Sequence, residues 1–339
     1  MSSERPRFIV AGVLRRLYCL LPNGKAVLDA PGGNLLYTAA GIKVWEPDTQ
    51  PGLIARVGED YPRAWIQTFA RRGMDVRGIE VLPEAIDLRS FVAYTDMHTR
   101  YIDDPVSHFA RLELSFPRTL LGYRNPIPTL DSRTTLLPVS LRQTDIPATY
   151  LDATAAHLCP IDYLTHSMLP AVLRQAEFTT ITVDPSPAYM NPTFWEHMPA
   201  LINGLTAFLP SEEEIRMLFQ GRSQDLWEMA ETLASYGCEI IVIKRGQAGQ
   251  LVYDGAAHRR YEVPAYNSML VDPSGAGDAF CGGFLTGYRL NYDPVEAALH
   301  GSISASMTVE GSDPFYALGA LPGLADARLE SLRNAVHRV

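Results

Sequence analysis

The chain has 339 residues, of which 47% are hydrophobic and 20% charged, a composition typical of a globular protein with a sizeable core. A formal net charge of −9 argues against the basic surface that nucleic-acid binding requires, and no apolar run reaches the roughly 18 residues of a membrane span. Any basic group that holds an anionic ligand must therefore be an individual side chain.

An apolar run near the N-terminus, FIVAGVL over residues 8–14, predicts a buried strand. Arg15 and Arg16 follow it and interrupt the apolar stretch, where a secretion signal tolerates no charge. The four cysteines are scattered, without CxxC or metal-ligand spacing, and we interpret them as buried, reduced thiols. Together these features indicate a cytoplasmic protein.

Two segments of the N-terminal half favour strands without intervening helices. Residues 16–33 predict a hairpin with Asn23-Gly24 as its turn, and 87–102 show imperfect alternation. They indicate a small β-layer apart from the main sheet. Residues 103–149 are rich in proline and polar residues, and we interpret them as an extended excursion around the active site. The other elements predicted here are a helix over 35–45, a strand over 53–58 and a helix over 61–73.

Strands and helices alternate more clearly in the C-terminal half. Strands are predicted over 155–160, 178–186, 205–211 and 238–246. Helices are predicted over 161–176, 211–221 and 223–237. Pro170 is expected to kink or divide the first of these helices. This alternation predicts an α/β fold, with a mostly parallel sheet covered by helices on both faces.

The stretch VDPSGAGDAFCGGFL sets a Gly275-Ala276-Gly277 loop before Asp278 at the start of a predicted helix. Free N–H groups at a helix N-terminus bind anions, and glycines let the backbone approach a phosphate closely. An aspartate at that point can take a proton from an attacking hydroxyl. The residue types alone leave a simpler alternative open, in which Asp278 only caps the helix. Phe280 breaks a GxGxxG pattern and no GxxxxGK[ST] occurs, which argues against a dinucleotide fold and a P-loop.

The longer stretch 272–285 resembles the C-terminal signature of the ribokinase-like (PfkB) carbohydrate kinase family. Further stretches resemble motifs of that family in the same order: Gly32-Gly33, residues 55–79, residues 183–185, residues 209–214 and residues 243–249. The resemblance covers nearly the whole chain and is weakest over 103–150. It implies a single domain over 1–339 with a ribokinase-like α/β fold. The lid, a small β-sheet, would come from about 15–33 and 87–102.

The resemblance also implies an activity, the transfer of phosphate from ATP to a hydroxyl of a sugar or sugar-like molecule with Mg2+. Asp278 would be the catalytic base. The N–H groups of Gly275, Ala276 and Gly277 would form an anion hole for the transferred phosphoryl. Residues expected to bind the nucleotide are Lys244, Gly246, Gly249 and Ser274. Residues expected to hold Mg2+ are Glu214, through water, and Asp184.

Simpler roles for some of these residues remain open at this point. Ser211 and Glu214 have capping-box spacing, so Glu214 has a structural role available. Lys244 is also explained as a solvated strand end, and Asp184 as turn chemistry before a proline. Asp272 and Ser274 match part of the family's monovalent-cation site, but we make no prediction of potassium.

The substrate half of the motif set departs from the family. Gly32 and Gly33 match, and Asn34, Tyr37 and Arg15 are candidate pocket residues. Arg15 and Leu17 stand where the family places the Asn and Asp that hold sugar hydroxyls. An arginine there favours an acceptor with a carboxylate or phosphate, because a guanidinium pairs with either in a bidentate manner. The alternative is an arginine that faces solvent on a lid strand.

Three further expectations complete the sequence interpretation. A nucleoside kinase is the second candidate, and it would need stacking aromatic side chains such as Tyr18, Tyr37 or Phe91. A catalytically silent relative that binds a ligand is the third candidate. A homodimer through the lid is expected from the apolar face or open edge that such a sheet leaves.

Overall fold

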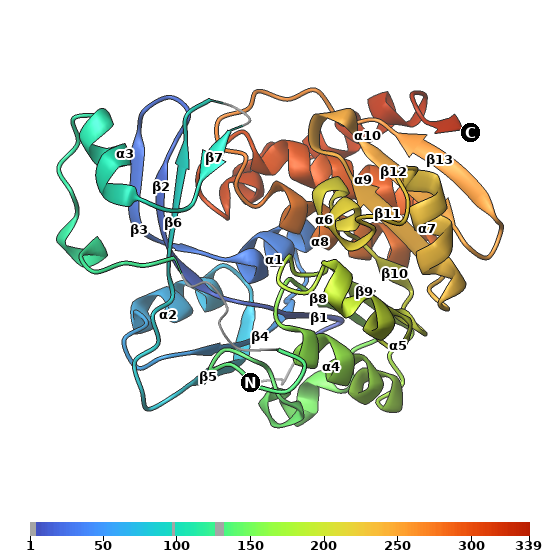
Figure 1. The fold of residues 1–339 in the computed structure, drawn as a ribbon, viewed down its shortest axis with the longest axis horizontal. Helices are drawn as coiled ribbons and strands as arrows, with labels where there is room; N and C mark the ends of the chain where they lie inside the picture. Colours follow the sequence, from blue (N-terminus) through green and yellow to red (C-terminus); the bar gives the residue numbers. More distant parts are fainter. Residues whose placement is uncertain (1–4, 97–98, 126–131) are drawn as a thin grey trace.

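A ten-stranded sheet forms the centre of the computed structural model, which describes residues 5–96, 99–125 and 132–339 (Figure 1). Within those ranges its order is β14-β13-β12-β11-β10-β9-β8-β1-β4-β5. Neighbouring strands run parallel from β5 to β11 and antiparallel from β11 to β14. The strands are β1 (Phe8–Ala11), β4 (Gly52–Val57), β5 (Asp75–Val81), β8 (Ala155–Leu158), β9 (Thr180–Val183), β10 (Ala207–Phe208), β11 (Ile240–Lys244), β12 (Gln250–Asp254), β13 (Arg259–Val263) and β14 (His337–Arg338).

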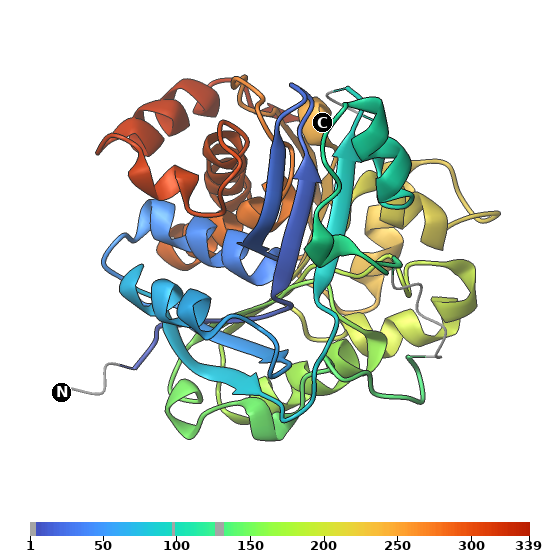
Figure 2. The same cartoon turned by 90° about the vertical axis from the view of Figure 1, so that its left-hand side faces the viewer.

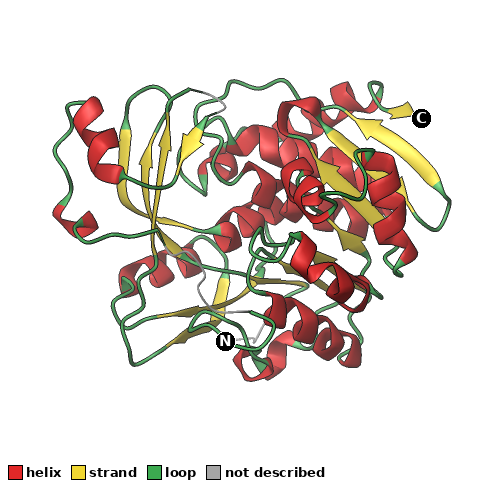
Figure 3. Ribbon diagram, in the orientation of Figure 1, coloured by secondary structure: helices red, strands yellow, loops and turns green. Residues whose placement is uncertain are grey.

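Helices cover both faces of this sheet, as predicted (Figure 3). One face carries α1 (Asn34–Trp45), α2 (Arg63–Arg71), α8 (Ala276–Asn291) and α9 (Pro294–Thr308), with α10 (Leu324–Arg333) against α9. The other face carries α4 (Tyr163–Gln175), α5 (Met198–Ile202), α6 (Glu212–Leu218) and α7 (Leu226–Ser235). Strands covered on both faces are buried along their whole length, which explains why β1 and β8 to β10 show no alternation of exposure. The polar side chains within them are paired, as His157 is with Thr182.

The contact between α1 and α8 places the N-terminus of α8 over the sheet. A Cβ atom on Gly282 would lie 2.0 Å from the carbonyl oxygen of Thr38. The absence of a side chain at Gly282 therefore lets the two helix backbones meet. Thr38 also donates its hydroxyl to the carbonyl oxygen of Asp278. These contacts hold the first turn of α8 against α1.

A separate four-stranded sheet, the lid, has the order β3-β2-β6-β7. Its strands are β2 (Arg15–Leu20), β3 (Ala26–Gly32), β6 (Arg89–Tyr94) and β7 (Arg100–Tyr101). The Asn23-Gly24 turn joins β2 and β3, with Gly24 at a φ of 78°. The predicted hairpin and the small β-layer are therefore confirmed.

The outer face of the lid is covered by the chain's own residues. Helix α3 (Pro105–Arg111) and the segment 112–123 pack there, as Figure 2 shows for the helix. Their side chains Phe109 and Leu120 contact Tyr18 and Phe91 in one buried cluster. The interpretation of 103–149 as an extended excursion is therefore wrong for this part. Apolar residues there bury themselves against the lid rather than follow the active site.

The fold also bears on the predictions made for Pro170 and for a membrane span. Pro170 lies inside α4, which runs without interruption from Tyr163 to Gln175, so the proline does not divide the helix. In the ranges that the structure describes, no helix is both long and apolar enough to cross a membrane.

Candidate active site

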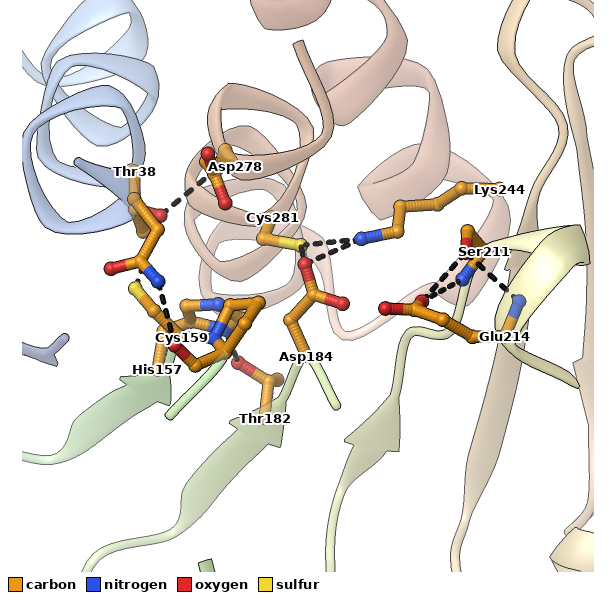
Figure 4. Close-up of polar contacts among 12 residues, drawn as sticks. Thr38, His157, Cys159, Thr182, Asp184, Ser211, Glu214, Lys244, Asp278 and Cys281 are labelled. Carbon is orange, nitrogen blue, oxygen red and sulfur yellow. Dashed lines mark hydrogen bonds and ion pairs between the residues drawn. The ribbon is translucent and has the colours of Figure 1, made fainter. Parts of the chain in front are cut away.

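The predicted catalytic and metal residues meet where β9, β10 and β11 end and α8 begins (Figure 4). Asp184 follows β9, Glu214 lies in the first turn of α6 after β10, and Lys244 ends β11. Asp278 lies in the first turn of α8. Ligands of open α/β sheets bind at the carboxyl ends of the strands, and this edge brings the four side chains together.

Backbone N–H groups at the start of α8 are available to an anion. The helix begins at Ala276, and no side chain caps it. Ala276 N–H makes a long hydrogen bond of 3.4 Å to Pro273, and the N–H groups of Gly275 and Gly277 bond to no acceptor among the described residues. The helix dipole adds positive potential at this end. These N–H groups are therefore available to an anion, and the anion hole expected of Gly275, Ala276 and Gly277 stays a prediction.

Tyr37 and Gly275 hold the shape of this loop. Gly275 has a φ of 76°, and a Cβ atom on it would lie 2.2 Å from the Tyr37 ring. Tyr37 is 5% exposed, so its ring supports the loop from below. It was predicted to contact substrate, and its position under Gly275 instead gives it a supporting role.

The lid contacts the same loop through Ser274. The Ser274 N–H donates to Asp272 Oδ1 at 2.9 Å, and the Ser274 hydroxyl lies 3.2 Å from the Tyr94 hydroxyl. Asp272 is buried, and its Oδ2 atom has no hydrogen-bond partner among the described residues. Sequence reasoning did not single out Tyr94. The signal available was its spacing, because residues 92 and 94 of one strand lie on the same face of the lid.

Lys244 is buried beside the anion hole, not solvated at a strand end. Its Nζ atom lies 2.5 Å from Asp184 Oδ2, and the two side chains are 12% and 4% exposed. A Cβ atom on Gly277 would lie 3.6 Å from the same Nζ. Burial opposes the charge on Lys244, but Asp184 and nearby acidic groups raise the pKa of its ammonium above the ordinary value. The lysine therefore stays charged among the carboxylates.

Glu214 has the structural role that its spacing predicted, and its role toward Mg2+ stays a prediction. It completes a capping box, since its Oε2 atom accepts from Ser211 N–H at 2.7 Å while Ser211 Oγ accepts from Glu214 N–H. It is also buried within reach of the charge on Asp184. Burial, together with repulsion from Asp184, raises the pKa of Glu214 to about 7.

Asp278 carries the chemistry of a base in this cluster. Burial raises the pKa of its carboxyl to about 6, with Lys244 lowering it and Glu214 raising it further. A base whose pKa lies near neutral is deprotonated at pH 7 and still accepts a proton readily. Its environment therefore suits general-base catalysis better than simple helix capping.

Two cysteines that were interpreted as inert core residues line the same region. Cys281 Sγ lies 3.5 Å from Asp184 Oδ2 and 3.7 Å from Lys244 Nζ, and Cys159 Sγ lies 3.4 Å from the Thr38 hydroxyl. Burial raises the pKa of both thiols well above the ordinary value. They are therefore neutral packing groups. Cys281 lies three residues after Asp278, so helical spacing alone would have placed it on the same face.

The two glycines predicted to bind nucleotide lie in a tight loop after β11. Gly246 begins a single 3-10 turn, Gly246–Ala248, and Arg245 N–H donates to the Gly249 carbonyl. Gly249 lies against β13, where a Cβ atom would approach Val263 O to 2.2 Å. A Cβ atom on Gly246 would have no neighbour within 4 Å, so the backbone of the loop is open at that residue.

The predicted substrate residues separate into two groups. Asn34 is hydrogen-bonded within the fold, because its Oδ1 accepts from Val13 N–H and its Nδ2 donates to Pro160 O, each at 2.8 Å. That amide anchors the loop after β1, so a substrate contact through it is not supported. Gly32, Gly33 and Arg15 lie together, with Arg15 opposite Gly32 across the β2–β3 pair.

The aromatic side chains that a nucleoside base would require do not face this site. Tyr18 and Phe91 lie in the cluster under α3 on the outer face of the lid. Tyr37 lies under Gly275. The idea that these residues stack on a base is therefore wrong, because strand alternation points Tyr18 and Phe91 away from the cleft.

The carboxylates fit a magnesium ion only with help from other ligands. Among the described residues, no three His, Cys, Asp or Glu side chains are grouped so as to hold a metal. Asp184 and Glu214 are nevertheless close enough to repel, and Asp184 Oδ1 is buried with no hydrogen-bond partner in the described ranges. Mg2+ commonly binds through one or two carboxylates, waters and substrate phosphates. The donor set therefore fits that ion.

Comparison with known proteins adds an independent line of support. The pfkB family carbohydrate kinase profile matches residues 149–316, about half of the chain. The chain is 28% identical over 276 residues to a cytidine kinase from Thermococcus kodakarensis, which covers 79% of this chain and 84% of that protein.

Solved structures show the same fold. A protein described as ribokinase II from E. coli, bound to ATP and Mg2+, aligns with a TM-score of 0.67 and 17% identity over 96% of this chain and 99% of that one. A Vibrio cholerae fructokinase mutant with fructose, ADP and potassium aligns with a TM-score of 0.65 and 18% identity over 97% and 99%. The ribokinase-like fold expected from the sequence is confirmed.

The family profile, the similar proteins and the residues at the start of α8 agree with one another. The chain belongs to the pfkB family of carbohydrate kinases and is a phosphotransferase of that type.

Proposed function

We propose that the protein transfers the γ-phosphate of ATP to a hydroxyl of a sugar or sugar-like molecule, with Asp278 as general base. The observation that carries the proposal is the shared first turn of α8. It presents unpaired N–H groups of Gly275 and Gly277 together with a carboxyl whose pKa is about 6. An anion site and a base within one helical turn suit an attacking hydroxyl and a phosphoryl group.

Each part of this phosphoryl transfer is assigned to particular residues. The acceptor oxygen bonds to the γ-phosphorus while the bond from phosphorus to the ADP oxygen breaks, and the hydroxyl proton passes to Asp278. The N–H groups of Gly275, Ala276 and Gly277 stabilise the charge on the transferred phosphoryl. Lys244, beside Gly277, adds a fixed positive charge at the same place. Gly246 and Gly249 line the nucleotide, and Ser274 holds the loop.

Asp184 and Glu214 are the residues that would hold Mg2+. When bound, the ion neutralises charge on the phosphates. The unpaired Asp184 Oδ1 supports this assignment. The unpaired Asp272 Oδ2 likewise supports a monovalent cation beside Ser274, and stimulation by K+ over Na+ would test it.

Release of ADP from Mg-ATP across sugars, sugar acids, sugar phosphates and nucleosides tests the proposal. We expect one acceptor class to give turnover, and Asp278→Asn to lower kcat by roughly 10²- to 10⁴-fold, the usual contribution of a general base. Equal turnover by Asp278→Asn would contradict the assigned base. ATP binding without turnover by any acceptor would favour the catalytically silent alternative.

A nucleoside kinase is the second candidate, and similarity to a cytidine kinase favours it. The outward positions of Tyr18 and Phe91 weigh against it, since they leave those rings unable to stack on a base. Tyr94 on the inner face is the aromatic side chain that remains near Ser274. Cytidine and inosine in the acceptor panel distinguish the two candidates.

A further inference from the structure

Arg15 begins β2 on the inner face of the lid. Residues 15, 17 and 19 share that face by strand alternation, and Leu17 and Cys19 belong to a cluster with Tyr94. Tyr94 contacts Ser274 of the anion-hole loop, so this face looks onto the cleft. Arg15 pairs with Gly32, and its backbone N lies 3.0 Å from where a Cβ atom on Gly33 would be. Strand register therefore puts Arg15 beside Gly32-Gly33, at the opposite end of this face from Tyr94.

The guanidinium of Arg15 has no counterion in the described parts of the chain. It makes no ion pair and no hydrogen bond with residues 5–96, 99–125 or 132–339. Burial lowers the pKa of Arg15 despite Asp87 and the Tyr123 phenol nearby. Both of those groups are already occupied. Asp87 pairs with Arg89, and the Tyr123 hydroxyl accepts from Phe91 N–H at 3.2 Å.

Arg16, the next residue, differs from Arg15 because it has an ion-pair partner. Arg16 points to the outer face of the lid and bonds Asp29 through Nε and Nη2 at 2.8 and 2.7 Å. A partly buried cation without a partner loses solvation and gains no ion pair in return. Arg15 is therefore placed as a binding group whose partner comes from outside the chain.

The first turn of α1 adds a second donor surface next to Arg15. The helix starts after Gly33, has no side-chain cap, and contains no acidic residue in its first turn. Unsatisfied N–H groups and the helix dipole favour a negative group at this end. Arg15 and the start of α1 meet at Gly32-Gly33, so both favour an anion at one place.

We propose that Arg15 binds an anionic group, a carboxylate or a phosphate, on the acceptor at the end remote from the reacting hydroxyl. This inference rests on the proposed phosphotransfer and narrows its substrate class to sugar acids or sugar phosphates. Arg15 is the specificity residue, and Leu17 beside it supplies apolar surface instead of a hydrogen bond to a sugar hydroxyl. The anion belongs to the acceptor, because the transferred phosphate binds at α8.

The test uses matched acceptors that keep a free primary hydroxyl: ribose, ribonate and ribose 1-phosphate; glucose, gluconate and glucose 1-phosphate; cytidine and inosine. ADP release is measured for the full chain and for Arg15→Met, Arg15→Lys and Arg16→Met. The last variant is the matched control, since its guanidinium is paired on the other face of the lid. Melting temperature with each acceptor, without ATP, gives a readout independent of turnover.

An anionic acceptor is expected to exceed its neutral partner in kcat/KM by roughly 10- to 100-fold, the effect of one charge-assisted pair. Arg15→Met should remove that preference through the acceptor KM, with the KM for ATP unchanged. Arg15→Lys should restore part of it, and Arg16→Met should retain it. The carboxylate and phosphate arms then identify which anion is bound.

A neutral sugar or nucleoside that is used as well as its anionic partner, with a KM that Arg15→Met leaves unchanged, would overturn the inference while phosphotransfer stands. If no acceptor gives turnover that depends on Asp278, the proposed function fails instead. The melting temperature still decides the role of Arg15 in that case. A rise with an anion that Arg15→Met abolishes supports the site, and no rise with any anion overturns it.

Discussion

Asp278, at the start of α8, shows how burial changes the pKa of a single carboxyl group. Asp278 is an aspartate with an ordinary sequence context for a helix start, and its burial raises the pKa to about 6. Lys244 lowers that pKa, which keeps the base ionised at neutral pH. The value depends on burial, on Lys244 from β11 and on Glu214 from α6, so the same aspartate on a surface helix would not have this raised pKa.

The first prediction concerns the pH dependence of Asp278. We expect kcat/KM to rise with pH through an apparent pKa of about 6, because the base must lose its proton. Stability follows the opposite direction. The folded-state pKa lies above the unfolded value, so stability from this group is fully present below the unfolded pKa and is lost as pH rises through about 6.

Asp278→Asn separates these two effects. The variant should have the lowered kcat given above, yet have a higher Tm than the parent chain at pH 8, with a smaller gain at pH 5. Thermal melts at both pH values check this. A lower Tm at pH 8 would show that the ionised carboxyl stabilises the fold, contrary to the effect of its burial.

The second prediction concerns the Lys244–Asp184 pair. Lys244→Met should lower the free energy of unfolding by about 3 kcal/mol, because it leaves Asp184 buried and unpaired. The double variant Lys244→Met, Asp184→Asn should recover much of that loss, since no uncompensated charge remains. Urea unfolding of the double variant and of both single variants, Lys244→Met and Asp184→Asn, measures the coupling. Additive losses in the double variant would mean that the two side chains act independently.

At the scale of elements, the site depends on how closely α8 approaches its neighbours. The first turn of α8 is held from below by Tyr37 on α1 and from the side by the lid through Tyr94. Gly282 brings the α1 and α8 backbones together one turn further along. The shape of the proposed anion hole therefore depends on helix packing as well as on the glycine-rich loop.

The third prediction compares two glycines that share a positive φ. Gly275 and Gly24 have φ values of 76° and 78°, but only Gly275 has neighbours within 4 Å of an added Cβ atom. Gly24→Ala should cost roughly 1 kcal/mol from backbone strain alone. Gly275→Ala should cost more and lower kcat, because Tyr37 and the anion-hole loop must move apart. Unfolding free energies and ADP release of both variants check the difference, and equal costs would contradict it.

For the whole molecule, the lid is the part with its own small core. Its outer cluster depends on α3, and its inner face meets the main domain at the cleft. Because the chain covers both faces, the expected homodimer no longer follows from an exposed apolar face. It now rests on the open edges at β3 and β7, and remains a proposal that size-exclusion chromatography with light scattering can test.

The fourth prediction tests the independence of the lid. Phe109→Ala removes a buried ring from the outer cluster and should destabilise the lid by about 3 kcal/mol. Amide hydrogen exchange should speed up in β2 and β6, with β8 to β11 unchanged, because few contacts connect the two sheets. Leu120→Ala, in the same cluster, serves as a second variant. Uniformly faster exchange would show one cooperative unit instead.

The sequence by itself determined the α/β alternation, the Asn23-Gly24 hairpin and the helix that begins at the Gly275-Ala276-Gly277-Asp278 motif. These features depend on local periodicity, turn chemistry and residue spacing, which short stretches of the sequence contain in full. Boundaries agreed less well, since β9 and β10 are shorter than the apolar runs that predicted them.

Only the tertiary structure decided which side chains meet. Lys244 had a simpler explanation as a solvated strand end until β9 placed Asp184 beside it, and Tyr18 and Phe91 were aromatic candidates until α3 covered them. Asn34 was a pocket residue until its amide bonded to Val13 and Pro160. Such contacts join residues far apart in the chain, and the packing that selects them leaves no periodic signal in the sequence.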